Sequence, residues 1–131
     1  MVKTIMAVDD NPDITDVIKQ GLEHLYPAEY KIVCVDSGEN CLRWLKENHL
    51  PDLILLDIMM PGMSGWETYE WIKENLLWRK IPIVFLTGRT DELAEKAGEF
   101  LGDDYIEKPF DMDDLKERID TVLNEKQKIG R

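Results

Sequence analysis

The chain has 131 residues, which is enough for one domain of ordinary size and too few for two. Hydrophobic residues make up 44% and charged residues 33%, so the composition supports a buried core and argues against intrinsic disorder. Sixteen Lys and Arg against 27 Asp and Glu give a net charge of −11, which would repel nucleic acids and anionic membranes. We therefore expect neither a nucleic-acid partner nor a membrane partner.

We expect no targeting segment in this chain. Its N-terminus runs directly into a strand-like stretch without a signal-peptide pattern, and no apolar run approaches the roughly 18 residues that a membrane span needs. We therefore expect a cytoplasmic protein. Cys34 and Cys41 show neither CxxC nor Cys/His ligand spacing, which predicts two buried thiols without a redox role.

Five short apolar runs predict strands. They lie at residues 5–8, 30–35, 53–56, 83–86 and 105–106. None alternates between apolar and polar residues, which is typical of strands that are covered on both faces.

Helical stretches separate these strands. The first has Asn11 as a cap and Pro12 at its first position, so its start is well defined. The residues expected on its inward face are Ile14, Val17, Ile18, Leu22 and Leu25. Four further helices are predicted to begin at or near Ser37, Gly65, Asp91 and Asp111.

Strict alternation of five strands with five helices predicts an α/β fold with a doubly wound parallel sheet. A parallel pair of strands needs a crossover, and the right-handed crossover places each helix on a face of the sheet. Ligands of such folds bind at the carboxyl ends of the strands. This rule predicts where the functional residues should lie.

Polar residues follow four of the predicted strands. Asp9 and Asp10 follow the first strand, Asp57 the third, Thr87 the fourth and Lys108 the fifth. Three carboxylates at one edge repel one another, and a hard divalent cation such as Mg²⁺ would relieve that repulsion. An ammonium and a hydroxyl suit the oxygens of a phosphoryl group. Unrelated surface charges would not explain why these residues fall at the same edge.

Four segments carry a resemblance to a known family. They stand at residues 8–10, 53–65, 85–88 and 103–110, and together they resemble the receiver domains of two-component response regulators. The resemblance implies a flavodoxin-like receiver fold with strand order 2-1-3-4-5. It also implies a receiver domain over residues 1–125, with residues 126–131 as a C-terminal tail or the start of a linker.

The resemblance further implies a metal site. Asp10 would bind Mg²⁺ directly, and Asp9 would help, partly through water. Asp57 and the backbone carbonyl of Met59 would complete the site, and Mn²⁺ would be able to substitute for Mg²⁺.

The resemblance also assigns roles in signalling. Asp57 would accept a phosphoryl group from a sensor histidine kinase or a phosphotransfer protein, and Thr87 and Lys108 would contact its oxygens. Tyr105 would be the switch aromatic. The phosphorylated chain would then control a downstream protein or an attached output domain, or form a homodimer. On this interpretation the chain is a switch and not an enzyme with a released product.

Two other classes of protein remain as alternatives. A magnesium-dependent phosphohydrolase with an aspartate nucleophile also needs carboxylates, but it usually carries two aspartates one residue apart and a cap over the substrate. Here Asp9 and Asp10 are adjacent, and no insertion is long enough for a cap. A flavodoxin-like electron carrier needs a Ser/Thr/Gly-rich phosphate loop after the first strand, where this chain has acidic residues that would repel phosphate.

Overall fold

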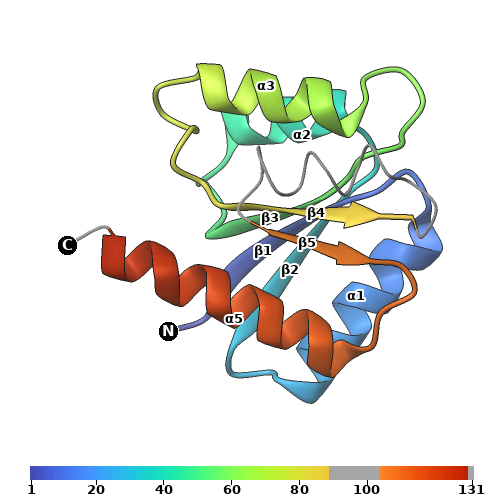
Figure 1. The fold of residues 1–131 in the computed structure, drawn as a ribbon, viewed down its shortest axis with the longest axis vertical. Coiled ribbons are helices and arrows are strands. Elements are labelled where there is room, and N and C mark those ends of the chain that lie inside the picture. The colour runs from blue at the N-terminus through green and yellow to red at the C-terminus, as the bar shows by residue number, and fades with distance from the viewer. Residues whose placement is uncertain (89–103, 130–131) are drawn as a thin grey trace.

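A five-stranded parallel sheet forms the centre of the structure (Figure 1). The structure is a computed structural model, and it describes residues 1–88 and 104–129. The strand order is β2-β1-β3-β4-β5, which confirms the expected parallel sheet and its order. The strands are β1 (Lys3–Val8), β2 (Tyr30–Val35), β3 (Leu53–Asp57), β4 (Ile83–Thr87) and β5 (Asp104–Glu107).

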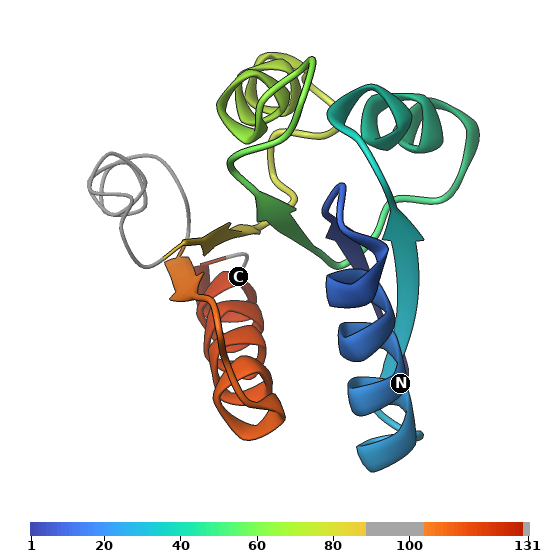
Figure 2. The ribbon, with the colours of Figure 1, turned by 90° about the vertical axis from the view of Figure 1, so that its right-hand side faces the viewer.

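Helices cover both faces of the sheet. They are α1 (Pro12–Leu25), α2 (Gly38–Glu47), α3 (Gly65–Glu74) and α5 (Met112–Ile129). Figure 2 shows α2 and α3 on one face and α1 and α5 on the other. Four of the five expected helices are thus confirmed, and the helix expected from Asp91 lies outside the described residues. None of the helices described is both long enough and apolar enough to cross a membrane.

Local capping explains where the helices begin. The side chain of Asn11 accepts a hydrogen bond from the N–H of Asp13 at 3.0 Å, and Ser37 caps α2 in the same way, as predicted. At the start of α3, Ser64 and Glu67 form a reciprocal capping box. The start at Gly65 was predicted, but this Ser-x-x-Glu signal was not used to predict it.

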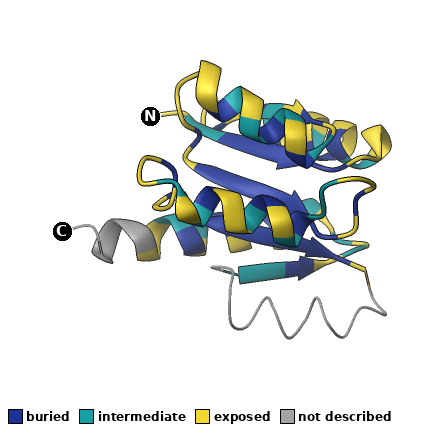
Figure 3. Cartoon of the chain, turned by 90° about the horizontal axis from the view of Figure 1, so that it is seen from above, coloured by how far each residue is buried: buried dark blue, intermediate teal, exposed yellow. Residues whose placement is uncertain are grey.

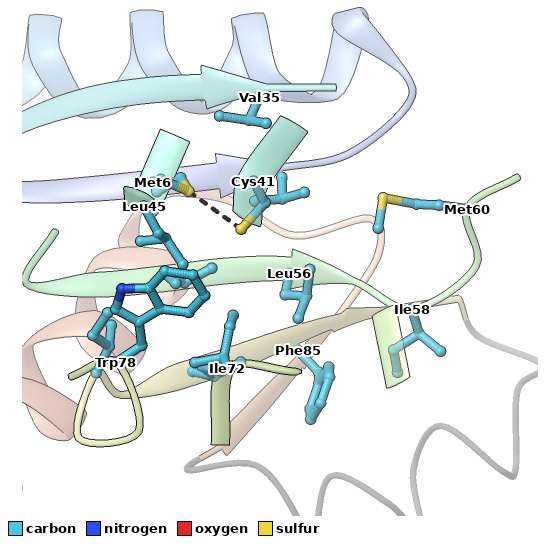
Figure 4. Packing of buried hydrophobic residues seen from close by; sticks show 14 residues of the cluster. Met6, Val35, Cys41, Leu45, Leu56, Ile58, Met60, Ile72, Trp78 and Phe85 are labelled. Carbon is cyan, nitrogen blue, oxygen red and sulfur yellow. Dashed lines mark hydrogen bonds between the residues drawn. The ribbon is translucent and has the colours of Figure 1, made fainter. Parts of the chain in front are cut away.

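The central strands β3 and β4 are buried along their whole length, and β2 and β5 at the edges of the sheet are buried only in part. Figure 3 shows the buried strands in dark blue between the helices. One hydrophobic cluster lies between the sheet and the α2–α3 layer, where Ile72 and Trp78 pack near Met6 and Cys41 (Figure 4). The thiol of Cys41 lies 3.6 Å from the sulfur of Met6. A second cluster lies on the α1 and α5 side and includes Leu22. The two clusters make the sheet a rigid support for residues at its edge.

Two details of the expected core are wrong. Cys34 is exposed, because it lies on the edge strand β2, where its thiol donates to the carbonyl of Thr15 at 3.5 Å. Val17 and Leu25 are also exposed, whereas Thr15 is buried with Ile18 and Leu22. The buried stripe of α1 is therefore narrower than the apolar stripe of its sequence.

Candidate functional site

The carboxyl ends of four strands bring the expected site residues to one edge of the sheet. Asp9 directly follows β1, Asp57 ends β3, Thr87 ends β4 and Lys108 directly follows β5. The backbone N–H of Lys108 donates to the carbonyl of Thr87 at 2.7 Å, which holds the start of the loop after β5 beside the end of β4. The structure thus brings these residues together where the topology predicts a ligand site.

Three carboxylates form the centre of this site. One oxygen from each of Asp9, Asp10 and Asp57 lies within 4.8 Å of the others. Asp9 is 1% exposed and Asp57 is 6% exposed, whereas Asp10 lies at the surface. The N–H of Asn11 donates to Oδ1 of Asp9 at 2.9 Å, so the start of α1 fixes this carboxylate.

Lys108 bridges two of the carboxylates. Its Nζ donates to Oδ2 of Asp9 at 2.6 Å and to Oδ1 of Asp57 at 3.3 Å. Lys108 was expected near a phosphoryl group, but its pairing with Asp9 was not predicted. No sequence signal gives that pairing, because it depends on how far the lysine side chain reaches across the sheet edge.

The charges at the site shift the pKa values of its groups. Burial and then the charge of Asp9 raise the pKa of Asp57 to about 6, against the opposite effect of Lys108. Burial lowers the pKa of Lys108, but its hydrogen bond to Asp9 and the charges of Asp57 and Asp9 outweigh burial, so its pKa is raised. Lys108 therefore stays protonated, whereas the raised pKa of Asp57 lies at about 6.

The donor set fits a hard divalent cation. Carboxylate oxygens are the ligands that Mg²⁺ prefers, and three of them lie within reach of one ion. Lys108 supplies a single positive charge to this cluster. Met59 follows Asp57 by two residues, and its side chain is 71% exposed, so its thioether does not pack into the core.

Thr87 and Tyr105 lie on the same face of neighbouring strands. In the register of β4 and β5, Phe85 stands opposite Tyr105 and Thr87 stands opposite Glu107. Thr87 is buried, and Tyr105 is partly buried against the cluster that contains Phe85. Thr87 and Tyr105 are therefore diagonal neighbours in the register of the two strands.

The start of α3 packs directly on the backbone of Asp57. The N–H of Gly65 donates to the carbonyl of Ile58 at 2.8 Å. A Cβ atom at position 65 would lie 2.2 Å from the carbonyl oxygen of Asp57, so a larger residue would force a shift. Gly65 was not predicted to have a role at the site, although a glycine beside the capping residue Ser64 was the available signal.

Comparisons with known proteins agree with this geometry. The family model described as "Response regulator receiver domain" matches residues 5–120. A protein of Vibrio cholerae named "Probable cyclic di-GMP phosphodiesterase" is 41% identical over 125 residues, which is 95% of this chain and 27% of that protein. The solved N-terminal domain of a response regulator receiver protein from Methanoculleus marisnigri is 43% identical to this chain, with a TM-score of 0.69. The match covers 94% of this chain and 98% of the solved chain.

A second solved structure gives the same result. A response regulator receiver domain protein from Methanospirillum hungatei is 36% identical to this chain and has a TM-score of 0.80. The match covers 95% of this chain and 97% of the solved chain. The chain spans 27% to 51% of the length of the first three curated relatives, which are therefore longer proteins. The matched family model shows that the chain belongs to the receiver domains of two-component response regulators, a family of signalling domains.

Proposed function

We propose that Asp57 accepts a phosphoryl group from a phosphohistidine of a sensor histidine kinase or a phosphotransfer protein. The observation that carries this proposal is the position of the Asp57 carboxylate, 3.3 Å from Nζ of Lys108 and beside two further carboxylates. A carboxylate oxygen attacks phosphorus as the phosphorus–nitrogen bond breaks. The imidazole leaves with the bonding electrons and takes up a proton.

Lys108 and Thr87 provide the positive charge and the hydroxyl donor for the transferred group. Negative charge gathers on the equatorial oxygens during transfer, and an ammonium and a hydroxyl at the same sheet edge stabilise it. The raised pKa of Lys108 keeps its ammonium charged. The aspartyl phosphate is a mixed anhydride, so water later removes the group. The domain assists both steps, and its output is a changed surface.

A divalent cation completes the proposed site. Asp9, Asp10, Asp57 and the backbone carbonyl of Met59 would hold Mg²⁺, and Mn²⁺ would be able to take its place. When bound, the cation supplies charge that offsets the three carboxylates and the phosphoryl oxygens. We assign these functions to a receiver domain over residues 1–125.

The proposed output route runs from Thr87 to Tyr105. A Thr87 hydroxyl that is drawn toward the phosphoryl oxygens leaves space on the side of β5, and Tyr105 is the large side chain beside that space. The change would alter the face that includes β5, α5 and the helix expected from Asp91. With beryllofluoride as the phosphoryl mimic, we expect changed amide hydrogen exchange at residues 104–110. Thr87→Ala should abolish this change, and an unchanged response in that variant would rule out the route.

The partners follow from this output. We propose that the altered face controls a downstream protein or an attached output domain in the cytoplasm, or joins two copies of the chain as a homodimer. The longer curated relatives, such as the heme response regulator HssR of Staphylococcus saprophyticus, of which this chain spans 51%, support an attached domain as one form of output.

Incubation with acetyl phosphate and Mg²⁺ tests the proposed function. Intact-mass spectrometry should show the gain of one phosphoryl group on the wild type and none on Asp57→Asn. Asp16→Asn, which removes an exposed carboxylate from α1, is the matched control and should gain the group. Steady release of phosphate without a mass gain would favour the phosphohydrolase alternative instead.

A further inference from the structure

The edge strand β2 has features that favour pairing with another strand. Among the described strands it pairs only with β1, so one side of its backbone has no strand beside it. Its sequence from Tyr30 to Val35 is apolar apart from Lys31 and contains no proline. Such an edge is a template for strand addition. The opposite edge, β5, has only four residues, two of them acidic.

The outward backbone groups of β2 are nevertheless occupied at the middle of the strand. The carbonyl of Val35 accepts a hydrogen bond from the N–H of Asp9, so the backbone groups of Val35 face β1. The backbone groups of successive residues in a strand point to opposite sides. The N–H and carbonyl groups of Ile32 and Cys34 therefore point outward, away from β1. The N–H of Ile32 donates to Oε2 of Glu23 at 2.8 Å. The carbonyl of Ile32 accepts from Nζ of Lys19 at 3.2 Å.

The two side chains come from α1, which lies beside β2 (Figure 2). Lys19 and Glu23 are four residues apart and form an ion pair at 3.1 Å. Their side chains are 45% and 33% exposed, and an ion pair this exposed adds little to stability. Glu23 accepts from the N–H of Ile32, and Lys19 donates to the carbonyl of the same residue. Together they occupy the two backbone groups that a neighbouring strand would otherwise bind. The hydrogen bond from Ile32 is also the main reason why the pKa of Glu23 is lowered.

We infer that Lys19 and Glu23 form an edge guard that prevents β2 from pairing with β2 of a second copy of this chain. A second copy fits because a two-fold axis at Ile32 would bring identical edges together in antiparallel pairing. That register places Lys31 opposite Val33, so like charges would not face each other directly. Tyr30 would stand opposite Cys34. The outward backbone groups of Cys34 are the next ones along β2 after those of Ile32, which the edge guard contacts.

Loss of the guard should have two measurable effects in the full chain. In Glu23→Ala, the amide of Ile32 should exchange about fivefold to tenfold faster, as expected for the loss of one hydrogen bond. The variant should also self-associate with rising concentration in sedimentation velocity experiments. Alanine favours helix, so α1 should persist, and circular dichroism checks this. Glu23→Gln keeps an acceptor oxygen and should stay closer to the wild type, and Gln20→Ala, at an exposed position on the same helix, is the control.

A second substitution identifies the surface that associates. Cys34→Pro removes an outward N–H and blocks the edge, because proline is tolerated where an edge strand faces solvent. Added to Glu23→Ala, it should restore the monomer. Three results would each overturn the inference: unchanged exchange at Ile32 in Glu23→Ala, faster exchange without self-association, or self-association that persists after Cys34→Pro.

Discussion

The charge of Asp57 depends on neighbours with opposing effects. Burial and the charge of Asp9 favour its protonated form, and Lys108 favours its ionised form. Burial and Asp9 prevail, so the pKa is raised to about 6 from an ordinary value of 3.8. The folded protein therefore binds this proton more tightly than the unfolded chain. The stability that the proton contributes is complete below about pH 4 and is lost as pH rises through about 6.

This linkage predicts how Asp57→Asn changes stability without metal. Asparagine has no ionised form, so the variant escapes the unfavourable charge beside Asp9 at neutral pH. We expect its stability relative to the wild type to increase between about pH 4.5 and pH 8, in the window that the raised pKa defines. Urea denaturation in EDTA at both pH values measures this difference, with Asp16→Asn as the control for removing one carboxylate. A relative stability that stayed constant with pH would contradict the raised pKa.

For the individual site residues, the sequence predicted where the site lies better than it predicted the contacts between their side chains. Asp9, Asp57, Thr87 and Lys108 could be assigned to one edge because the ends of parallel strands meet there whatever the side chains do. The bridge from Lys108 to Asp9 could not be predicted, since it joins residues 99 positions apart through a flexible side chain.

For the helices as well, features that depend on neighbouring residues were predicted better than features that depend on tertiary packing. Caps such as Asn11 and Ser37 were predictable because the side chain bonds to a backbone group two or three residues away. The inward face of α1 was predicted less well. Val17 and Leu25 carry apolar side chains but lie at the surface, because the angle at which α1 meets the sheet decides which stripe is buried.

The start of α3 carries a prediction for Gly65. In Gly65→Ala, the new Cβ would meet the carbonyl oxygen of Asp57 at 2.2 Å, and backbone at that distance has to move. We expect a loss of about 1–3 kcal/mol in the free energy of unfolding, although alanine is the better helix former. Phosphorylation of Asp57 should also become slower. Gly88→Ala is the control, since a Cβ there has nothing within 4 Å, and equal stability of the two variants would argue against the close contact.

At the scale of the whole molecule, two kinds of repulsion act together. The chain carries a net charge of −11, and any added salt screens this general repulsion. The cluster of Asp9, Asp10 and Asp57 adds a local repulsion that only an ion bound between the carboxylates would relieve. The two effects can be separated, because the general one depends on ionic strength and the local one on the identity of the cation.

Mg²⁺ should therefore stabilise the protein beyond the effect of salt alone. Free Mg²⁺ at ten times its dissociation constant adds about 1.4 kcal/mol to the free energy of unfolding, or about 5 °C in melting temperature for a chain of this size. Thermal melts in MgCl₂ and in NaCl of equal ionic strength measure the specific part. Asp10→Asn should lose most of that part, because it removes a ligand at the surface of the cluster, whereas Asp16→Asn should keep it. If the wild type melted at the same temperature in both salts, the three carboxylates would not form a binding site for the metal.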